Sequence, residues 1–257
     1  RRRTTLILSL AAVTFMVLIL LFSRLLLFPE FEEIEHAEMI DYTTQEISEF
    51  DEMYAQVVNS LQGDAYWDDT QMYLRGEYPE YPDENTTPDY IAALDLDFIA
   101  FADVEGSILS YMMVDIEEEQ EIDPPPGLLE AVTPLTDIAL YPDADSTMSG
   151  ILDIDGQLMI VAALPALSNE RQGPPAGTVI GAIILDERRV SELINSSLIT
   201  MALFPLSHPL PDDITFDNRA GLQSEIVVKS LSADTVAGYS IVRSPFGDPV
   251  ALLRRSS

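Results

Sequence analysis

An apolar run near the N-terminus constrains this chain more than any other feature. From Thr4 to Phe28 the sequence is TTLILSLAAVTFMVLILLFSRLLLF, in which Arg24 is the only charged residue. About 20 apolar residues cross the core of a bilayer as a helix, so the run predicts a membrane span. A cleaved signal peptide is the alternative. It is less favoured because the run exceeds the usual apolar core of about 7–15 residues and no clear cleavage site follows.

Three arginines, Arg1 to Arg3, precede the apolar run. Because Lys and Arg flanks stay in the cytoplasm, we expect residues 1–3 to be cytoplasmic, residues 4–28 to lie in the lipid bilayer and the rest to lie outside the cell. The predicted location is therefore the cell membrane. We also expect the chain to stop before a second transmembrane helix.

The net charge excludes one class of partner. The chain carries a formal charge of −31, from 44 acidic and 13 Lys and Arg residues. Between Arg24 and Arg171 the only Lys or Arg is Arg75. No basic patch for nucleic acid is therefore expected. Two explanations of the charge stay open: an acidic shell that keeps the protein soluble, which we favour, or a field that attracts cationic ligands.

Residues 29–62 predict one long amphipathic helix. Apolar residues recur at steps of three and four, a spacing typical of a helix that faces one partner. These seam residues are Ile40, Thr43, Ile47, Phe50, Tyr54, Val57 and Leu61. At 1.5 Å per residue such a helix rises about 50 Å, more than one small domain needs. The seam favours a stalk that pairs with its copy in a homodimer, and an ordinary amphipathic core helix is the alternative.

We expect Gly63 to end that helix, and residues 63–257 to form one α+β domain. Apolar runs separated by short acidic turns predict hairpins. The predicted elements are a loop over 78–85, a short helix over 89–94, a hairpin over 96–113, an acidic surface loop over 117–123, a helical segment over 128–140, a hairpin over 150–164, a strand over 177–185, a helix capped by Asp186 that continues through Leu193 and Ile194, and a hairpin over 237–254. Together they predict a meandering antiparallel sheet covered on one side by helices.

The stretch from Gly63 to Tyr73 is the candidate ligand site. It holds the only tryptophan of the chain beside tyrosines and two adjacent carboxylates. Aromatic rings of this kind can form the wall of a pocket, and one carboxylate could pair with a cationic ligand group or with an arginine. The predicted ligand-binding residues are Tyr66, Trp67, Asp68, Asp69, Tyr73 and Arg75. The alternative is aromatic packing where the helix meets the sheet, with the carboxylates capping backbone N–H groups.

The usual catalytic sets are missing from the sequence. There is no cysteine, and the two histidines, His36 and His208, lie in the predicted stalk and in a loop without a nucleophile elbow. Adjacent carboxylates such as Asp68 and Asp69 point in different directions and make a poor acid–base pair. The acidic segment 143–147 lacks the Gly and Glu of a calcium loop. We therefore predict no catalytic residue, metal ligand or cofactor, and we do not expect an enzyme.

Several separated motifs resemble one family of sensor domains. They are Asp64-Ala65-Tyr66-Trp67-Asp68-Asp69-Thr70, Asn85, Leu96-Asp97-Phe98-Ile99 with Asp103-x-x-Gly106, Gly150, the run 158–165, the run 173–177, Gly181 and Leu185-Asp186. In this order, from Phe31 to Leu203, the chain resembles the type-four CHASE domain. The resemblance implies a PAS-like or Cache-like sensory fold, a membrane anchor on each side and a cytoplasmic histidine kinase or diguanylate cyclase output.

Two residues depart from the family pattern. Ala166 stands where an aliphatic residue such as Ile is more usual, and Ala182 stands where arginine is common. If that arginine binds ligand in relatives, this chain recognises something else or uses Arg171 instead.

The expected function is the detection of a small extracytoplasmic ligand. The alternatives are a structural dimerisation and spacer module without a ligand and a membrane-anchored hydrolase.

Overall fold

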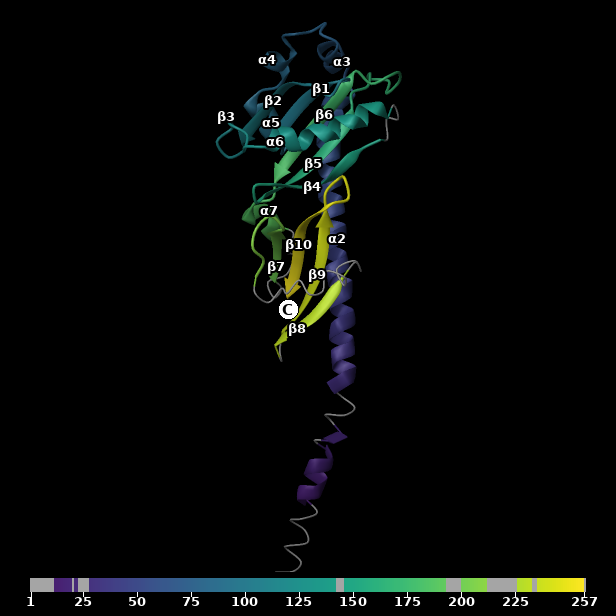
Figure 1. Ribbon diagram of the computed structural model, residues 1–257, viewed down its shortest axis with the longest axis vertical. Coiled ribbons are helices and arrows are strands. Elements are labelled where there is room, and N and C mark those ends of the chain that lie inside the picture. The colour runs from purple at the N-terminus through teal and green to yellow at the C-terminus, as the bar shows by residue number, and fades with distance from the viewer. Residues whose placement is uncertain are drawn as a thin grey trace, which may run out of the picture.

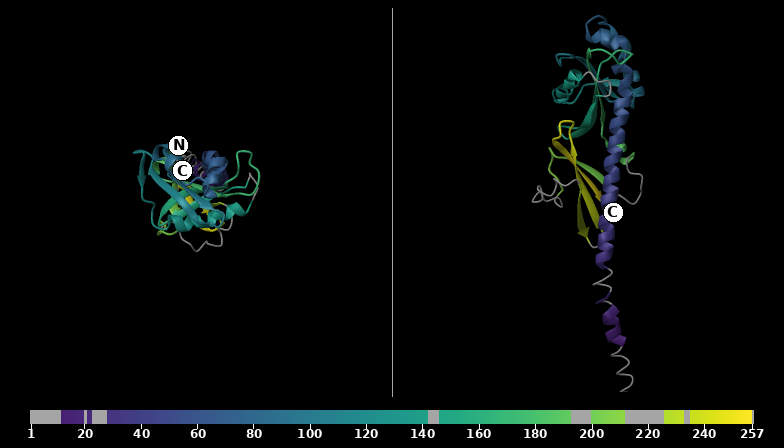
Figure 2. Two further views of the ribbon diagram at one scale, coloured as in Figure 1. Left: turned by 90° about the horizontal axis from the view of Figure 1, so that it is seen from above. Right: turned by 90° about the vertical axis from the view of Figure 1, so that its right-hand side faces the viewer.

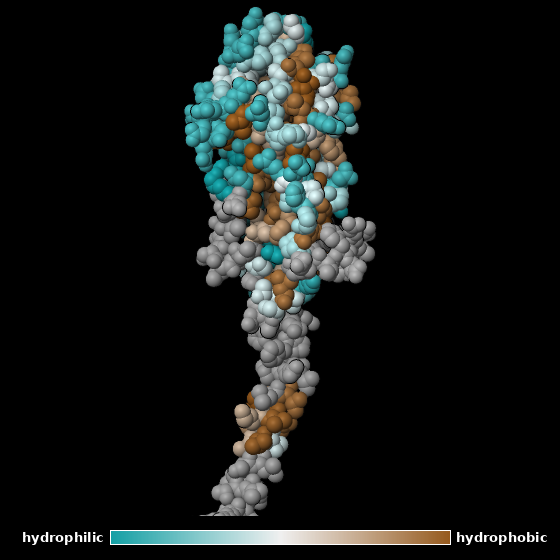
Figure 3. Space-filling model, turned by 60° about the vertical axis from the view of Figure 1, so that its left-hand side comes forward, coloured by the Kyte–Doolittle hydropathy of each residue, from teal (hydrophilic) through white to brown (hydrophobic). Residues whose placement is uncertain are grey.

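The computed structural model describes residues 12–19, 21–22, 28–141, 146–192, 200–211, 226–232 and 235–256. The predicted cytoplasmic flank 1–3 and most of the predicted span 4–28 lie outside these residues. In the described ranges we find no helix that combines the length and the apolar character needed to cross a bilayer. The described residues near the N-terminus are nevertheless apolar and exposed, with Phe15 at 66% and Phe22 at 60%, and they form a hydrophobic patch in Figure 3.

A single helix sets the long axis of the molecule. Helix α2, Phe28–Ala65, has 38 residues and runs beside both β-sheets (Figures 1 and 2). It continues past Gly63, where the sequence predicted its end. Ala65 is fully buried, and its carbonyl oxygen accepts a hydrogen bond of 2.8 Å from the N–H of Leu167. This tertiary contact stabilises the last turn of the helix, which therefore does not end at Gly63.

The strands form two antiparallel sheets. The larger sheet contains β1 (Phe98–Asp103), β2 (Ile108–Asp115), β3 (Gln120–Ile122), β4 (Met148–Ile154), β5 (Gln157–Pro165) and β6 (Gly177–Ile184), in the order β3-β2-β1-β6-β5-β4. The smaller sheet contains β7 (Thr200–Pro205), β8 (Val227–Ser232), β9 (Thr235–Arg243) and β10 (Pro249–Ser256), in the order β7-β10-β9-β8. The larger sheet lies farther from the N-terminal end of α2, and we call it the distal sheet and the other the proximal sheet (Figure 1).

All three predicted hairpins, β1–β2, β4–β5 and β9–β10, are confirmed. The prediction of one sheet is wrong, because β10 pairs with β7 and closes a separate sheet. Strands β7 and β8 were not predicted, and β3 lies within the acidic segment that was predicted as a loop. Strand pairing between distant segments leaves little trace in local sequence patterns, which explains these misses.

Helices cover both faces of the distal sheet, so the expectation of helices on one side is also wrong. One face packs against α2, α3 (Asp68–Leu74), α4 (Tyr81–Asn85) and α5 (Pro88–Ala93), with Ile99 and Phe101 of β1 in that core. The other face packs against α6 (Leu128–Val132) and the 3-10 helix η2 (Thr133–Leu140), with Phe98 and Ala100 in that core. Successive side chains of β1 point to opposite faces of the sheet, so this one strand contributes residues to both cores.

Four local predictions can be compared directly. The helical segments at 89–94 and 128–140 are confirmed by α5, α6 and η2. The loop predicted over 78–85 contains helix α4, because Pro82 is tolerated in a first helical turn and Tyr81 is fully buried. Asp186 caps α7 (Glu187–Glu192), since its Oδ1 accepts the N–H of Arg189 at 2.7 Å. The predicted continuation to Leu193 and Ile194 lies outside the described residues.

The seam of α2 packs on the sheets of its own chain. Thr43, Phe50, Val57 and Leu61 are buried. Leu61 lies over Gly181 of β6, where an added Cβ would come within 2.6 Å of a leucine methyl group. Thr43 and Met39 lie over Gly238 of β9, where an added Cβ would meet the hydroxyl oxygen of Thr43 first and the Met39 side chain at 3.1 Å. These four residues therefore behave as those of an amphipathic core helix do, and their burial leaves the predicted pairing with a second copy to the exposed part of the helix.

Candidate functional site

Three short helices cover the end of the distal sheet where α2 ends. We call residues 66–94, which include α3, α4 and α5, the helical cap (Figure 1). Trp67 is the N-cap residue of α3, with extended backbone angles of φ −124° and ψ 133°. Asp68 and Asp69 then fall in the first turn of α3, where negative charge is favourable near the helix N-terminus.

The ring of Tyr81 lies at the centre of the helical cap. It stacks on Tyr73 with a centroid separation of 5.3 Å and meets Trp67 edge-on at 5.7 Å. Phe101 of β1 lies against it at 5.6 Å and Tyr78 at 5.9 Å. Aromatic pairs in these geometries stabilise beyond their area of burial. The predicted alternative, aromatic packing where helix meets sheet, thus describes Trp67 and Tyr73, while Trp67 stays partly exposed at the surface of the cluster.

A buried carboxylate lies beneath this aromatic cluster. Asp64, in the last turn of α2, is 1% exposed. Its Oδ1 accepts a hydrogen bond from the hydroxyl of Tyr81 at 3.2 Å, and its Oδ2 accepts one from Tyr90 at 3.0 Å. The Tyr81 hydroxyl is also 2.8 Å from that of Thr70. No ion pair among the described residues reaches Asp64.

The environment of Asp64 shifts three pKa values. Burial raises the pKa of the Asp64 carboxyl, and the hydrogen bonds from Tyr90 and Tyr81 oppose that rise. Burial and the nearby Asp64 charge raise the pKa of Tyr81 and of Tyr90. Both hydroxyls therefore keep their protons and act as donors to the carboxylate. Perturbed, buried groups of this kind occur preferentially at functional sites.

Asp64 was not among the predicted site residues. The signal available was its place directly before Ala65, Tyr66 and Trp67 in the motif that resembles the CHASE domain. Its burial could not be predicted, because it depends on α4 and α5 folding back over the end of α2.

The two adjacent carboxylates have separate roles. Asp68 is exposed, and its two oxygens accept hydrogen bonds from the backbone N–H and side-chain amide of Asn169 at 3.0 and 3.1 Å. It therefore joins α3 to the loop after β5. Asp69 is half-buried, and Arg75 is exposed at the C-terminal end of α3. None of the ion pairs in the described part of the chain joins Arg75 to either carboxylate, so that predicted pairing is not found.

Arg171 reaches the helical cap from the same loop. Its guanidinium carbon lies 4.3 Å from the centroid of the Tyr66 ring, a cation–π arrangement. Its side chain also donates to Oε1 of Gln62 at 3.4 Å. Ala182, which stands where arginine is common in the family, is fully buried on the opposite face of the distal sheet, toward η2. The structure thus brings Arg171, not residue 182, to the helical cap.

A buried ion pair lies where the chain leaves β6 of the distal sheet and enters α7. Arg189 of α7 is 5% exposed and pairs with Asp97, the residue before β1. Asp97 Oδ2 also accepts the N–H of Ile184 at 2.6 Å, and Arg189 donates to Asp95 at 3.2 Å.

The described residues contain no group of three or more His, Asp or Glu placed to hold a metal ion. The acidic residues 143–145 lie outside them.

Two solved structures share this fold. The extracellular domain of vpHK1S-Z8, described as a histidine kinase, aligns with a TM-score of 0.52 at 13% identity, covering 86% of this chain and 89% of that one. A domain of a sensory box/GGDEF family protein from Vibrio parahaemolyticus aligns with a TM-score of 0.52 at 14% identity, covering 86% and 93%. The chain therefore shares the overall fold of these two domains.

The CHASE4 domain profile matches residues 40–203, more than half of the chain. The chain belongs to the CHASE4 family, as its motifs implied. A relative of known role is the methanogenesis regulatory histidine kinase FilI of Methanothrix harundinacea (strain 6Ac), 23% identical over 189 residues. The match covers 74% of this chain and 21% of that protein, so the chain spans about a fifth of the length of this relative.

Proposed function

We propose that this chain is the extracytoplasmic sensing part of a membrane-bound signalling receptor, and that a small ligand binds at the helical cap. The kinase FilI and the sensory box/GGDEF protein are signalling proteins with regions similar to this chain, which supports the class of receptor. A kinase or cyclase would be the output, on the cytoplasmic side of the apolar N-terminal segment.

One observation carries the proposal: the last turn of α2 is part of the candidate site. Asp64 accepts hydrogen bonds from α4 and α5 residues, while the same helix runs without a break back to Phe28, beside the apolar segment. A ligand that changes how α4 and α5 sit on Asp64 would shift α2 along its length. It can do so only through a difference in its affinity for two arrangements of the helix.

We further propose a homodimer, although its contact cannot use the buried seam residues Thr43, Phe50, Val57 and Leu61 and is left to the N-terminal end of the seam, at Ile40, and to Ile34 before it. Ile34 and Ile40 of α2 remain 53% and 43% exposed, and they lie in the part of the helix nearest the apolar segment. Exposed apolar residues on a helix next to a membrane are suited to pairing with a second copy. Sedimentation of the chain and of the Ile34→Ser, Ile40→Ser double variant would test this, since loss of a dimer is expected in the variant.

The ligand proposal is tested by thermal stabilisation. A panel of metabolites and ions is screened for compounds that raise the melting temperature of the chain, because a binder of the native state must stabilise it. For any hit, Trp67→Ala should reduce the stabilisation at fixed ligand concentration. Tyr141→Ala removes an exposed ring outside the helical cap, 57% exposed at the end of η2, and should leave it unchanged.

A panel with no hit would favour the alternative of a structural spacer module. Equal stabilisation of the chain and of a folded Trp67→Ala variant would place the ligand outside the helical cap.

A further inference from the structure

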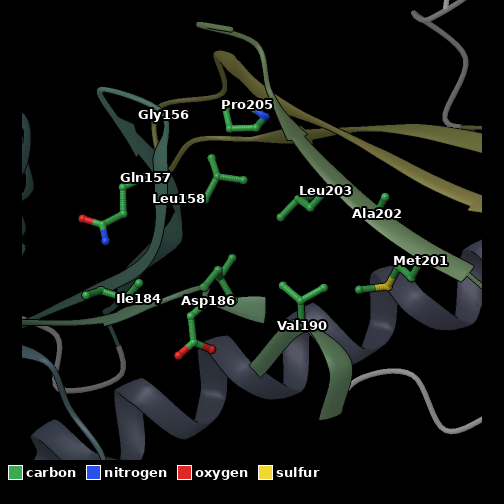
Figure 4. A pocket seen from close by; sticks show the side chains of 11 residues that line it. Gly156, Gln157, Leu158, Ile184, Asp186, Val190, Met201, Ala202, Leu203 and Pro205 are labelled. Carbon is green, nitrogen blue, oxygen red and sulfur yellow. The ribbon is translucent and has the colours of Figure 1, made fainter. Parts of the chain in front are cut away.

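A cavity lies between the two sheets, far from the helical cap. It has a volume of about 640 Å³ and is lined by the ends of β5 and β6, by α7 and by β7 (Figure 4). Strands β5 and β6 belong to the distal sheet, β7 belongs to the proximal sheet, and α7 lies between them in the chain. Pockets for small molecules span about 300–1,000 Å³, so this one is of ordinary size.

The side chains that point into the cavity are apolar. Figure 4 shows Leu158, Val190, Met201 and Leu203 directed toward the same space from β5, α7 and β7. Leu158 and Met201 are buried, whereas Val190 and Leu203 keep part of their surface open. Protein interiors are normally close-packed, and apolar walls give water few partners for hydrogen bonds. The cavity is partly open to solvent and part of its lining is polar, but these four side chains give it an aliphatic surface suited to the apolar part of a guest.

The charged residues around the cavity limit the charge that a bound molecule can have. None of the described residues that line it is Lys, Arg or His. The one carboxylate in the lining, that of Asp186, points away from the middle of the cavity in Figure 4 and uses Oδ1 to cap α7. An anionic head would meet the field of a chain with net charge −31. A cationic head would find no buried carboxylate turned toward it.

We propose that this cavity binds a small uncharged molecule with an aliphatic chain, at a site distinct from the helical cap. The aliphatic chain lies among Leu158, Val190, Met201 and Leu203. The bound molecule contacts both sheets at once, because the walls of the cavity come from β5 and β6 on one side and from β7 on the other.

The test uses n-alcohols from n-butanol to n-decanol as probes and the methyl resonances of the 257-residue chain labelled at methionine. The Met201 methyl resonance, assigned with Met201→Leu, should shift saturably, while that of Met72 on α3 should stay constant. Affinity should rise about fourfold for each methylene added and level off once the aliphatic chain fills the cavity.

Variants locate the binding. Val190→Phe occupies the cavity and Leu203→Ser makes one wall polar, so each should weaken n-octanol binding by about tenfold or more. Leu109→Phe, at a residue 45% exposed on β2, is the matched control and should leave the affinity unchanged. Melting curves check that each variant folds, and Leu203→Ser carries the test if Val190→Phe does not.

The proposal is overturned if the Met201 and Met72 resonances shift in parallel without saturation. It is also overturned if affinity in a folded Leu203→Ser variant equals that of the parent chain, since binding would then lie elsewhere.

Discussion

At the scale of single residues, Asp64 is the least conventional feature of the protein. Its carboxylate is buried among aromatic rings, accepts hydrogen bonds from two tyrosine hydroxyls and has no cationic partner in the described part of the chain. Removing a charge from water without a counter-charge is costly, and hydrogen bonds offset only part of that cost. Because the burial of this carboxylate at the end of α2 is costly, we propose it as a group through which a ligand acts.

Variants of Asp64 should separate its charge from its hydrogen bonds. Burial raises the pKa of Asp64 in the folded state. Its contribution to the free energy of unfolding is therefore greatest below about pH 3.9, the usual Asp pKa, and is lost as pH rises through the folded pKa. Asp64→Asn, which keeps the shape, should be at least as stable as the parent at pH 7, and its advantage should shrink as pH falls.

Asp64→Ala is the contrasting change. It leaves the Tyr90 hydroxyl without its partner and should cost about 1–3 kcal/mol in the free energy of unfolding at pH 7. Urea titrations of the three proteins at several pH values measure both effects. A difference between parent and Asp64→Asn that does not change with pH would show that the carboxyl titrates normally.

At the scale of elements, contacts of α7 and α2 hold the parts of the fold in place. Helix α7 is attached to the start of β1 through the buried pair Arg189–Asp97 and lies between the distal sheet and β7. Helix α2 contacts the distal sheet where Leu61 lies over Gly181, and the proximal sheet where Thr43 lies over Gly238. Both attachments depend on close approach of specific residues, so both can be tested by single substitutions.

Breaking the buried ion pair should be more costly than replacing it. Arg189→Met leaves the Asp97 charge buried and unpaired, which we expect to cost about 3–5 kcal/mol. Adding Asp97→Asn should recover a large part of that loss, because the amide can still accept the N–H of Ile184. A double-mutant cycle from chemical denaturation measures the coupling. Additive losses would mean that the two side chains do not interact as described.

The contact between α2 and β6 should show size complementarity. Gly181→Ala places a methyl group against Leu61 and should destabilise the fold by about 1–3 kcal/mol through overpacking. Adding Leu61→Ala vacates that space. The double variant should then be more stable than the sum of the two single losses predicts, as measured by denaturant unfolding. A Gly181→Ala variant as stable as the parent would show that α2 moves away from β6 without cost.

At the scale of the whole molecule, acidic charge dominates. The net charge of −31 belongs to an elongated molecule, and on the face drawn in Figure 3 hydrophilic residues surround hydrophobic patches in its distal part. Mutual repulsion destabilises a compact state, and salt screens it over a Debye length of about 10 Å at 0.1 M and about 3 Å at 1 M.

We therefore expect the melting temperature to rise as sodium chloride increases over this range. A series at matched osmolality in sucrose is the control, because sucrose stabilises by exclusion and not by screening. A melting temperature that is insensitive to salt while it responds to sucrose would show that repulsion contributes little to the stability of this fold.

Features carried by neighbouring residues could be predicted. The three-and-four spacing along 40–61 predicted α2, alternating runs around acidic turns predicted the hairpins, and the crowding of aromatic and acidic residues after Gly63 predicted the place where helix meets sheet. The order of separated motifs predicted the CHASE4 family. Each of these depends on interactions across a few residues, which local periodicity records directly.

Features that join distant segments needed the three-dimensional fold. No local pattern in β7 indicates that it pairs with β10 to make a second sheet, and no local pattern in α2 indicates that Leu61 and Thr43 meet Gly181 and Gly238. The burial of Asp64 depends on two later helices, and the cavity exists only where two sheets approach α7. Side-chain period records which face is apolar, but only packing determines what covers that face, because hydrophobic burial is non-directional and many partners satisfy it equally well.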